Sequence, residues 1–296
     1  MATQTVVSQS ALHKGRLKLV LGFTSLYLIV EVIGGIWTKS LALLADAGHM
    51  MTDVGGLALS LIAISLAERK ASPQRTYGYY RAEILAALTN AVVLIGISVY
   101  ILYEAYLRFL NPPEVESKEM LVVAAIGLLV NVAGMMILRK SSKDSLNMKG
   151  AYFEVLSDML TSIGVIVAGV IMLTTGWYYA DPLLSAGIGL LILPRTWILM
   201  KESIHVLLEG TPKDVDIAAL EKAMLELDEV ESVHDLHVWT LTSGVNAMSA
   251  HVVVKEAAVY NRVLEALQKE IKDNFNVVHT TLQLEGKGFN EAEIPF

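Results

Sequence analysis

Two stretches of the chain are long, apolar and free of charged residues, and they restrict the fold more than any other feature. They cover residues 84–103 and 120–138. The hydrocarbon core of a bilayer requires about 20 predominantly apolar residues in helical form. Both stretches meet this requirement, so the sequence predicts that the chain spans a membrane.

Four further apolar stretches are long enough to span a bilayer but contain a few ionisable residues: 19–37, 40–66, 151–175 and 178–200. The last stretch ends near Arg195 and Lys201, whose long side chains can extend to the membrane interface. Six spans place both ends of the chain on the same side of the membrane. The first stretch is too long for a signal-peptide core, and we expect it to be retained.

Basic residues indicate which side that is. Eleven of them precede the first span or lie between spans two and three or four and five: Lys14, Arg16, Lys18, Arg69, Lys70, Arg75, Arg81, Arg139, Lys140, Lys143 and Lys149. The opposite loops contain Lys39, Arg108 and Lys118. The positive-inside rule therefore predicts a multi-pass protein of the inner cell membrane, with both termini in the cytoplasm.

The composition changes near residue 209. Residues 209–296 hold 16 acidic and 7 basic residues, whereas residues 1–208 hold 14 and 16. Over the whole chain, 18% of residues are charged, against about 25% in ordinary soluble domains. This balance excludes an ordinary soluble enzyme, a disordered chain and a nucleic-acid-binding protein. Because there is no cysteine, any metal must be held by His, Asp and Glu.

The polar tail has the pattern of a small α+β domain. Helical periodicity and strand alternation follow one another in the order α-β-β-α-β, over residues 214–227, 230–241, 248–255, 258–275 and 277–285. Such an order is typical of a two-layer sandwich with its helices on one face. We therefore predict a six-helix, all-α transmembrane domain over residues 1–208 and a cytoplasmic α+β domain over residues 209–296.

Ionisable residues inside two of the spans are the strongest functional signal. His49 and Asp53 lie four residues apart in span two, and Glu154 and Asp158 have the same spacing in span five. Each pair shares one face of its helix, and an isolated charge at mid-bilayer costs about 2.5–3.5 kcal/mol. Two such faces in contact would offer one imidazole and three carboxylates to a divalent ion.

Other residues near this pattern have weaker interpretations. Asp46 lies one turn before His49 and is a secondary candidate, while Glu31 and Asp181 lie nearer span ends and are expected to be solvated or hydrogen-bonded. Gly48, Gly55, Gly56 and Gly164 would let spans two and five approach closely. The alternative to a metal site is that all four ionisable residues are buried structural groups.

The chain resembles the cation diffusion facilitators, and among them the bacterial cobalt–zinc–cadmium resistance type. The resemblance rests on SLALLADAGHMMTD, YGYYRAEILAALTNA, GAYFEVLSDMLTSIGV, WYYADPLLSAGIGLLIL, LLEGTP and HDLHVWTLTSG. It implies a homodimer of six-helix protomers that exchanges metal for protons, and not an enzyme. It also implies that the tail is a metallochaperone-like domain that pairs across the dimer.

The family pattern differs from this sequence in two respects. Zinc-transporting members usually carry His where this chain has Glu154, so zinc is the expected ion while cadmium and cobalt remain alternatives. No histidine lies in residues 68–77 or 139–149, so the metal sites that some members have in those loops are predicted to be absent.

The resemblance also suggests roles for residues near and within the tail. It assigns His234, His251, His279 and Glu285 to a cytoplasmic metal site, and Arg81 and Glu209 to an ion pair between the membrane and tail domains. His237 is a looser candidate. Because His234 and His237 have opposite parity on their strand, we expect them to face opposite sides of the sheet.

These residues predict secondary active efflux of divalent cations from the cytoplasm in exchange for protons. Metal binding requires deprotonated carboxylates and a neutral imidazole, so metal and protons compete for one set of ligands. The alternatives are an intramembrane metal-dependent hydrolase with Glu154 as general base, a metal channel, and a sensor that binds metal without transporting it. The expected partners are the lipid bilayer, a second copy of the chain, protons and Zn²⁺, Cd²⁺ or Co²⁺.

Overall fold

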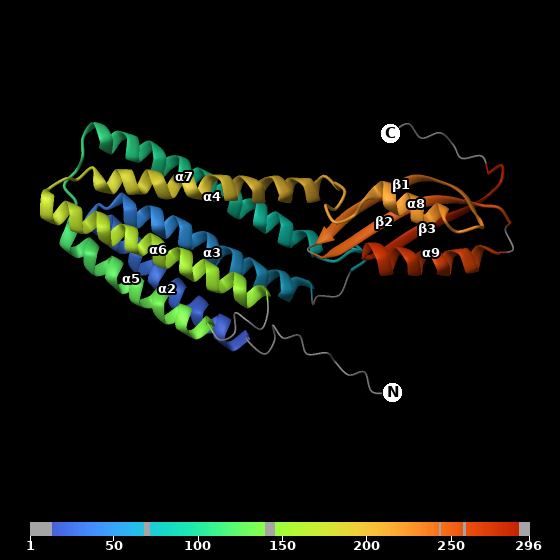
Figure 1. Cartoon of the computed structure of the whole chain (residues 1–296), viewed down its shortest axis with the longest axis horizontal. Helices are drawn as coiled ribbons and strands as arrows, with labels where there is room; N and C mark the ends of the chain where they lie inside the picture. The colour runs from blue at the N-terminus through green and yellow to red at the C-terminus, as the bar shows by residue number, and fades with distance from the viewer. Residues whose placement is uncertain (1–13, 68–71, 140–145, 243, 257–258, 290–296) are drawn as a thin grey trace. The chain divides into compact units, whose positions relative to one another are not determined.

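The computed structural model describes residues 14–67, 72–139, 146–242, 244–256 and 259–289. Six long helices precede the tail: α2 (Lys14–Thr38), α3 (Leu41–Ala67), α4 (Tyr80–Leu110), α5 (Ser117–Leu138), α6 (Leu146–Thr175) and α7 (Ala180–Leu207). Figure 1 shows that they run alongside one another as a bundle. The six-helix prediction is confirmed, and each helix covers one predicted span.

Five of these helices are long and apolar enough to cross a membrane, judged over the described residues: α2, α4, α5, α6 and α7. The sixth predicted span coincides with α3, a helix of 27 residues. Many large apolar side chains of the bundle are exposed, including Leu129 and Leu191 at 70% and 76%. A surface of this kind suits a lipid environment rather than water.

Packing inside the bundle joins the helices that carry the candidate ligands to their neighbours. One buried cluster includes Ala42 and Leu43 of α3 together with residues of α5 and α6. A second cluster joins Leu41 of α3 to Ile101 of α4 and Ile188 of α7. The first turns of α3 are therefore enclosed by apolar side chains on both sides.

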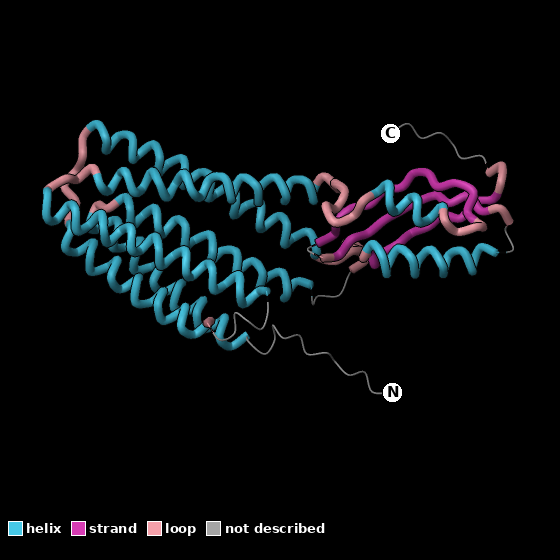
Figure 2. Tube along the Cα trace, in the orientation of Figure 1, coloured by secondary structure: helices cyan, strands magenta, loops and turns pink. Residues whose placement is uncertain are grey.

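The tail consists of α8 (Ile217–Leu225), β1 (Val230–Thr242), β2 (Val245–Val254), α9 (Tyr260–Phe275) and β3 (Val277–Gly286). Figure 2 shows the strands of this part of the chain in magenta and its helices in cyan. The sheet has the order β1-β2-β3, with β1 antiparallel and β3 parallel to β2. The predicted α-β-β-α-β order is confirmed.

Local sequence explains the boundaries of the tail helices. The Asp216 side chain accepts hydrogen bonds from the backbone N–H groups of Ala218 and Ala219, which caps α8. α9 ends at Asn276 in the left-handed conformation, with φ 52°. Leu220 of α8 and Leu267 of α9 enter the same core as Val252 of β2. Both helices therefore cover one face of the sheet.

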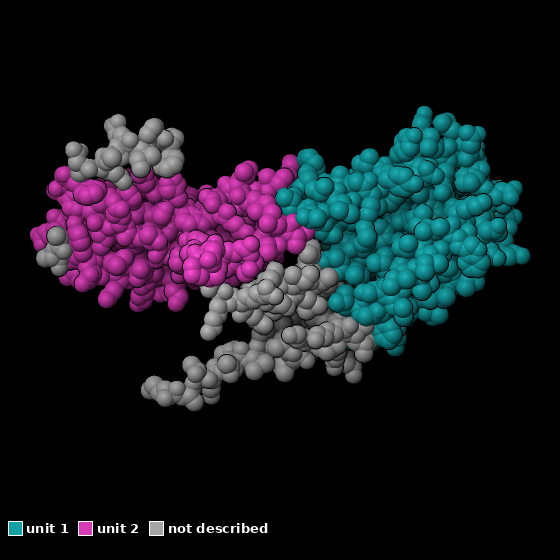
Figure 3. Space-filling model, turned by 180° about the vertical axis from the view of Figure 1, so that it is seen from behind, with its two compact units in different colours: residues 1–62, 87–200 teal, residues 63–86, 201–296 magenta. Residues whose placement is uncertain are grey.

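The chain forms two compact units, which Figure 3 shows in different colours. One unit comprises residues 1–62 and 87–200, and the other residues 63–86 and 201–296. The predicted division between residues 208 and 209 falls just after α7, which ends at Leu207. That division stays a prediction.

Candidate metal sites

Two of the four predicted membrane ligands lie close together across two helices. His49 of α3 has its Nε2 atom 3.7 Å from Oδ1 of Asp158 on α6. Both side chains are largely buried, at 14% and 5% exposure. An imidazole and a carboxylate at this separation, enclosed by apolar helices, can enter the coordination shell of one divalent ion.

The other two predicted ligands occupy the same helices. Asp53 lies one helical turn after His49, and Glu154 lies one turn before Asp158. Their backbones are helical, but their side chains lie outside the described residues. Helical periodicity alone places each on the face of its neighbour, so their part in the site stays a prediction.

A group of buried acids lies on the neighbouring turns. Asp46 is 1% exposed and Glu31 of α2 is 0% exposed. Tyr27 donates its hydroxyl to Oε1 of Glu31 at 3.0 Å. Glu31 is therefore hydrogen-bonded, as expected, but it is not solvated. In the sequence, this hydrogen bond is indicated only by Tyr27, which lies one helical turn before Glu31.

Two of the glycines, Gly48 and Gly55, face a different helix from the one that the sequence suggested. A Cβ atom at Gly48 would lie 3.2 Å from Ile97 of α4, and one at Gly55 would lie 2.9 Å from Oδ1 of Asn90, also on α4. These glycines therefore allow α3 to approach α4 rather than α6. The prediction was wrong because sequence does not show which neighbour a helix face meets.

A second group of ligand atoms lies on the sheet of the tail. One atom each from His234, His251 and Glu285 lies within 4.8 Å of the others. His251 Nδ1 is 3.0 Å from Oε1 of Glu285, and His234 Nε2 is 3.6 Å from Oε2. Glu285 is 4% exposed, and Gln283 donates to it at 2.9 Å. Two imidazoles beside a buried carboxylate form three sides of a tetrahedral zinc site.

The prediction that His234 and His237 face opposite sides of the sheet was wrong. His234 pairs with His251 and His237 pairs with Ser249, so three steps along β1 match two along β2. The extra residue is the bulge at Asp235, whose φ is 47°. Because it interrupts the alternation, both histidines lie on the face opposite the helices.

The remaining tail candidates lie apart from this group. His279 is in register with Ala247, four residues along β2 from His251, and its ring contacts the Tyr77 ring edge-on. His237 lines a cavity of about 810 Å³. In this chain, neither one joins the three clustered ligands among the described residues.

The predicted ion pair is present in the structure. Arg81, in the first turn of α4, has its Nη2 atom 2.7 Å from Oε1 of Glu209, which follows α7. Both side chains are more than one-third exposed, so the pair adds little to stability. Glu209 has a left-handed backbone with φ 59°. Its role as a link between domains stays a prediction.

Comparison with known proteins covers almost the whole chain. The family model described as the cation efflux transmembrane domain matches residues 17–208. The model described as the cytoplasmic domain of cation efflux proteins matches residues 212–287. Together they include every candidate ligand in both groups.

Several characterised relatives are similar over most of their length. The metal cation efflux system protein CzcD of Cupriavidus metallidurans is 51% identical over 91% of this chain and 85% of its own. The cadmium, cobalt and zinc/H⁺-K⁺ antiporter of Bacillus subtilis is 44% identical over 89% and 86%. The zinc transporter ZitB of Escherichia coli is 40% identical over 91% and 87%.

A solved structure also matches part of the chain. It is the metal-bound C-terminal domain of the CzcD transporter, which is 41% identical to 24% of this chain over 99% of its own length. The TM-score is 0.23.

Proposed function

The chain belongs to the cation efflux family, and from this premise we propose that it exports divalent metal cations in exchange for protons. The single observation that carries the proposal is the contact between His49 and Asp158, 3.7 Å apart on different helices of the bundle. Members of this family are transporters rather than enzymes, which excludes the hydrolase alternative.

The transport site we propose consists of His49, Asp53, Glu154 and Asp158. One imidazole and three carboxylates give the metal-filled site a formal charge of −1. Carboxylates suit hard ions and imidazole suits borderline ones. Zinc is the expected cargo, with cadmium and cobalt as alternatives, because one relative is named for all three ions and another for zinc.

Coupling to protons follows from the chemistry of this ligand set. Three carboxylates close together in a medium of low dielectric constant cannot all stay ionised without a cation. Protons therefore occupy the site when metal leaves, and metal must displace them when it binds.

We propose that both termini are cytoplasmic and that the protein lies in the inner membrane. This orientation follows from the distribution of basic residues along the chain. It places the tail, and with it the second metal site, on the side from which the metal is taken. Export follows when the far side of the membrane is the more acidic one, because protonation there releases the ion.

The tail is proposed to pair two copies of the chain and to bind regulatory metal through His234, His251 and Glu285. The face of the sheet that carries these ligands is not covered by α8 or α9, which pack on the other face. His279 lies on the same uncovered face, in register with Ala247. A second copy seated on this face could bring its own ligands to the site.

Flux measurements in sealed proteoliposomes test the proposal. Zinc entry should be fast when the lumen is acidic. Because protons leave as zinc enters, the pH of the lumen should rise, which a trapped dye can measure. It should fall at least tenfold when the pH gradient is dissipated. Flux that ignores the gradient would identify a channel, and metal binding without flux would identify a sensor; either result contradicts the proposal.

A further inference from the structure

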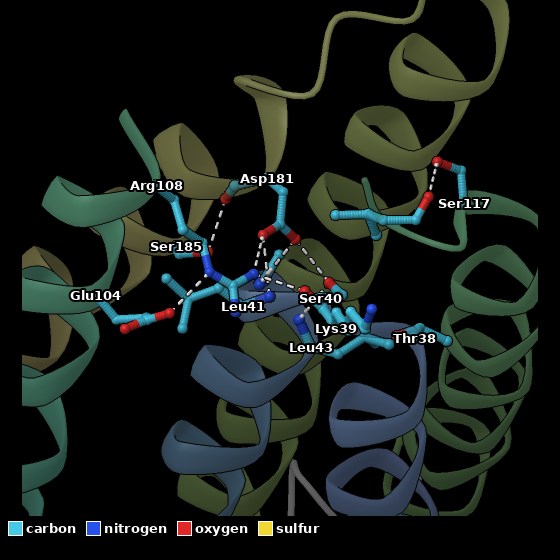
Figure 4. A network of polar contacts seen from close by, with 12 residues as sticks. Thr38, Lys39, Ser40, Leu41, Leu43, Glu104, Arg108, Ser117, Asp181 and Ser185 are labelled. Carbon is cyan, nitrogen blue, oxygen red and sulfur yellow. Dashed lines mark hydrogen bonds and ion pairs between the residues drawn. The ribbon is translucent and has the colours of Figure 1, made fainter. Parts of the chain in front are cut away.

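A fully buried carboxylate lies at the point where three helices of the bundle meet (Figure 4). Asp181, in the first turn of α7, is 0% exposed. Its Oδ1 accepts hydrogen bonds from Ser40 Oγ at 2.7 Å and from the N–H of Ala42 at 3.1 Å. Its Oδ2 accepts from the N–H of Leu41 at 2.9 Å and from Arg108 Nη1 at 3.3 Å.

Three of these four partners can only donate: the N–H groups of Leu41 and Ala42 and the guanidinium of Arg108. The Ser40 hydroxyl accepts from the N–H of Leu43 at 3.2 Å and directs its own hydrogen at Asp181. These contacts suit a carboxylate, whose charge is offset by Arg108 and by the buried N–H groups at the start of α3. An ionised group buried without water is costly unless paired in this way.

Arg108 ties the turn between α2 and α3 into the same contact. Its Nη1 also donates to the carbonyl oxygen of Lys39, a residue in the left-handed conformation with φ 57°. Its Nε donates to Glu104 at 3.1 Å, one turn earlier on α4. Because a non-glycine residue adopts positive φ only at a cost, surrounding contacts must hold this turn in place.

The helix fixed by this contact is the one that carries the candidate ligand His49. α3 is continuous from Leu41 to Ala67, and His49 lies eight residues after Leu41, about 12 Å along the axis at 1.5 Å per residue. A slip of α3 by one residue would change the axial position of His49 by about 1.5 Å. The 3.7 Å separation of His49 from Asp158 would not survive such a slip.

We propose that Asp181, together with Arg108, is a positioning residue that sets the axial height of α3 and hence the affinity of the membrane site for its metal. The inference rests on the proposed transport function, since it assumes that His49 binds the ion. Asp181 itself does not touch the metal. It holds the first turn of α3 against α4 and α7, and α3 transmits that position to the ligand.

Asp181→Asn is the sharpest test, because it keeps the shape but turns one acceptor into a donor. Full-length protein would carry His234→Ala and His251→Ala in every sample, so that bound metal reports the membrane site. Zinc affinity at equilibrium and the half-saturating zinc concentration and maximal rate of flux are measured, together with the dimer fraction and unfolding temperature. Loss of a group that orients metal ligands typically costs about 10- to 100-fold in metal affinity, and we expect the dissociation constant and the half-saturating concentration to rise by a factor in this range.

Two buried hydroxyls serve as matched controls. Ser185 lies one turn after Asp181 on α7. Among the described contacts, its hydroxyl donates a hydrogen bond to the Asp181 backbone carbonyl, within the same helix. Ser117 donates to the Val115 carbonyl at the start of α5. Ser185→Ala and Ser117→Ala each remove a buried hydroxyl without touching α3, so zinc affinity should stay within twofold of the parent.

Three outcomes separate the interpretations. Unchanged zinc affinity in a folded Asp181→Asn protein, with only the maximal rate and unfolding temperature lowered, would overturn the proposal. If that variant does not fold, Ser40→Ala decides. It removes one donor of four to Asp181 and also the hydroxyl that accepts from the N–H of Leu43, and both contacts hold the start of α3. A rise of about threefold supports positioning, and no rise overturns it. A parent that binds zinc but shows no flux would refute the proposed function, while the binding comparison would still test the position of α3.

Discussion

His49 and Asp158 are the residues on which the transport site depends most directly. Their contact joins α3 to α6 through side chains that are largely buried. Sequence could identify both, because an ionisable pair with i, i+4 spacing inside an apolar span is a local signal. It could not show which two helices meet, since that depends on the packing of all six.

Asp158→Ala is expected to reduce zinc flux at least 100-fold while leaving membrane insertion and the dimer fraction unchanged. The substitution removes a ligand but does not reduce the apolar character of α6. Initial zinc uptake into proteoliposomes and size-exclusion chromatography measure the two properties. Ser157→Ala, at the exposed neighbouring position, is the control; normal flux in Asp158→Ala would show that Asp158 is not a ligand.

Glu154→His should shift the preference of the site towards zinc over cadmium and cobalt. A second imidazole replaces one carboxylate, so the formal charge of the metal-filled site changes from −1 to zero. The new imidazole also binds a proton and must lose it to bind metal, and its ordinary pKa lies above that of a carboxyl group, so the pH profile of uptake should move to higher pH. Competition between the three ions, and zinc uptake against pH, provide the test. If the ion order and the pH profile both match the parent, Glu154 is not a ligand.

Among the elements, β1 shows where sequence pattern fails. Its length and position follow from alternation, which is why residues 230–241 were predicted and Val230–Thr242 is observed. The bulge at Asp235 was missed, because aspartate is enriched at positive φ but occurs far more often without it, so the residue type alone does not indicate a bulge. The same limit applies to Asp181, whose four partners come from distant parts of the sequence.

The bulge leads to a prediction about a deletion variant. In a strand without a bulge, deleting one residue would move the residues after it to the opposite face of the sheet; here it should not. Deleting Asp235 removes the extra residue but leaves His234 opposite His251 and His237 opposite Ser249, with regular alternation between them. Residues 209–296 lacking Asp235 should therefore bind as much zinc per protomer as the parent. Asp235→Val should instead destabilise the fold by about 1–2 kcal/mol, because a β-branched residue resists the left-handed conformation.

Calorimetry and urea unfolding followed by Trp239 fluorescence measure these two effects. Trp239 is the only tryptophan in residues 209–296. Loss of zinc binding in the deletion variant would mean that the faces of β1 depend on the bulge after all. Asp235→Gly, which adopts positive φ readily, is the control for the valine variant.

For the whole molecule, the two groups of ligands belong to different compact units. His49 and Asp158 lie in the first unit, and His234, His251 and Glu285 lie in the second. Apolar spans and a change of charge along the chain are properties of composition, and they indicated from sequence that the two groups of ligands lie in different parts of the chain. Composition does not determine how the two units are arranged.

Removal of residues 210–296 should lower flux and the dimer fraction without abolishing zinc binding in the bundle. The tail supplies the proposed pairing surface, whereas all four proposed transport ligands lie within residues 49–158. Crosslinking in membranes measures the dimer fraction, and zinc uptake measures flux. Full-length Asp158→Ala is the control, because it should form the dimer normally without transporting zinc. Unchanged flux and dimer fraction would show that the tail is dispensable for both.

The parallel edge strand of the tail determines when its metal ligands are complete during synthesis. β3 joins the sheet only beside β2, after the crossover through α9, and Glu285 lies 34 residues after His251. Because domains fold in order from the N-terminus as they are made, His234 and His251 emerge well before the carboxylate that joins them. All four proposed membrane ligands are thus made before any ligand of the tail, and the three-ligand group of the tail cannot form until β3 has been made.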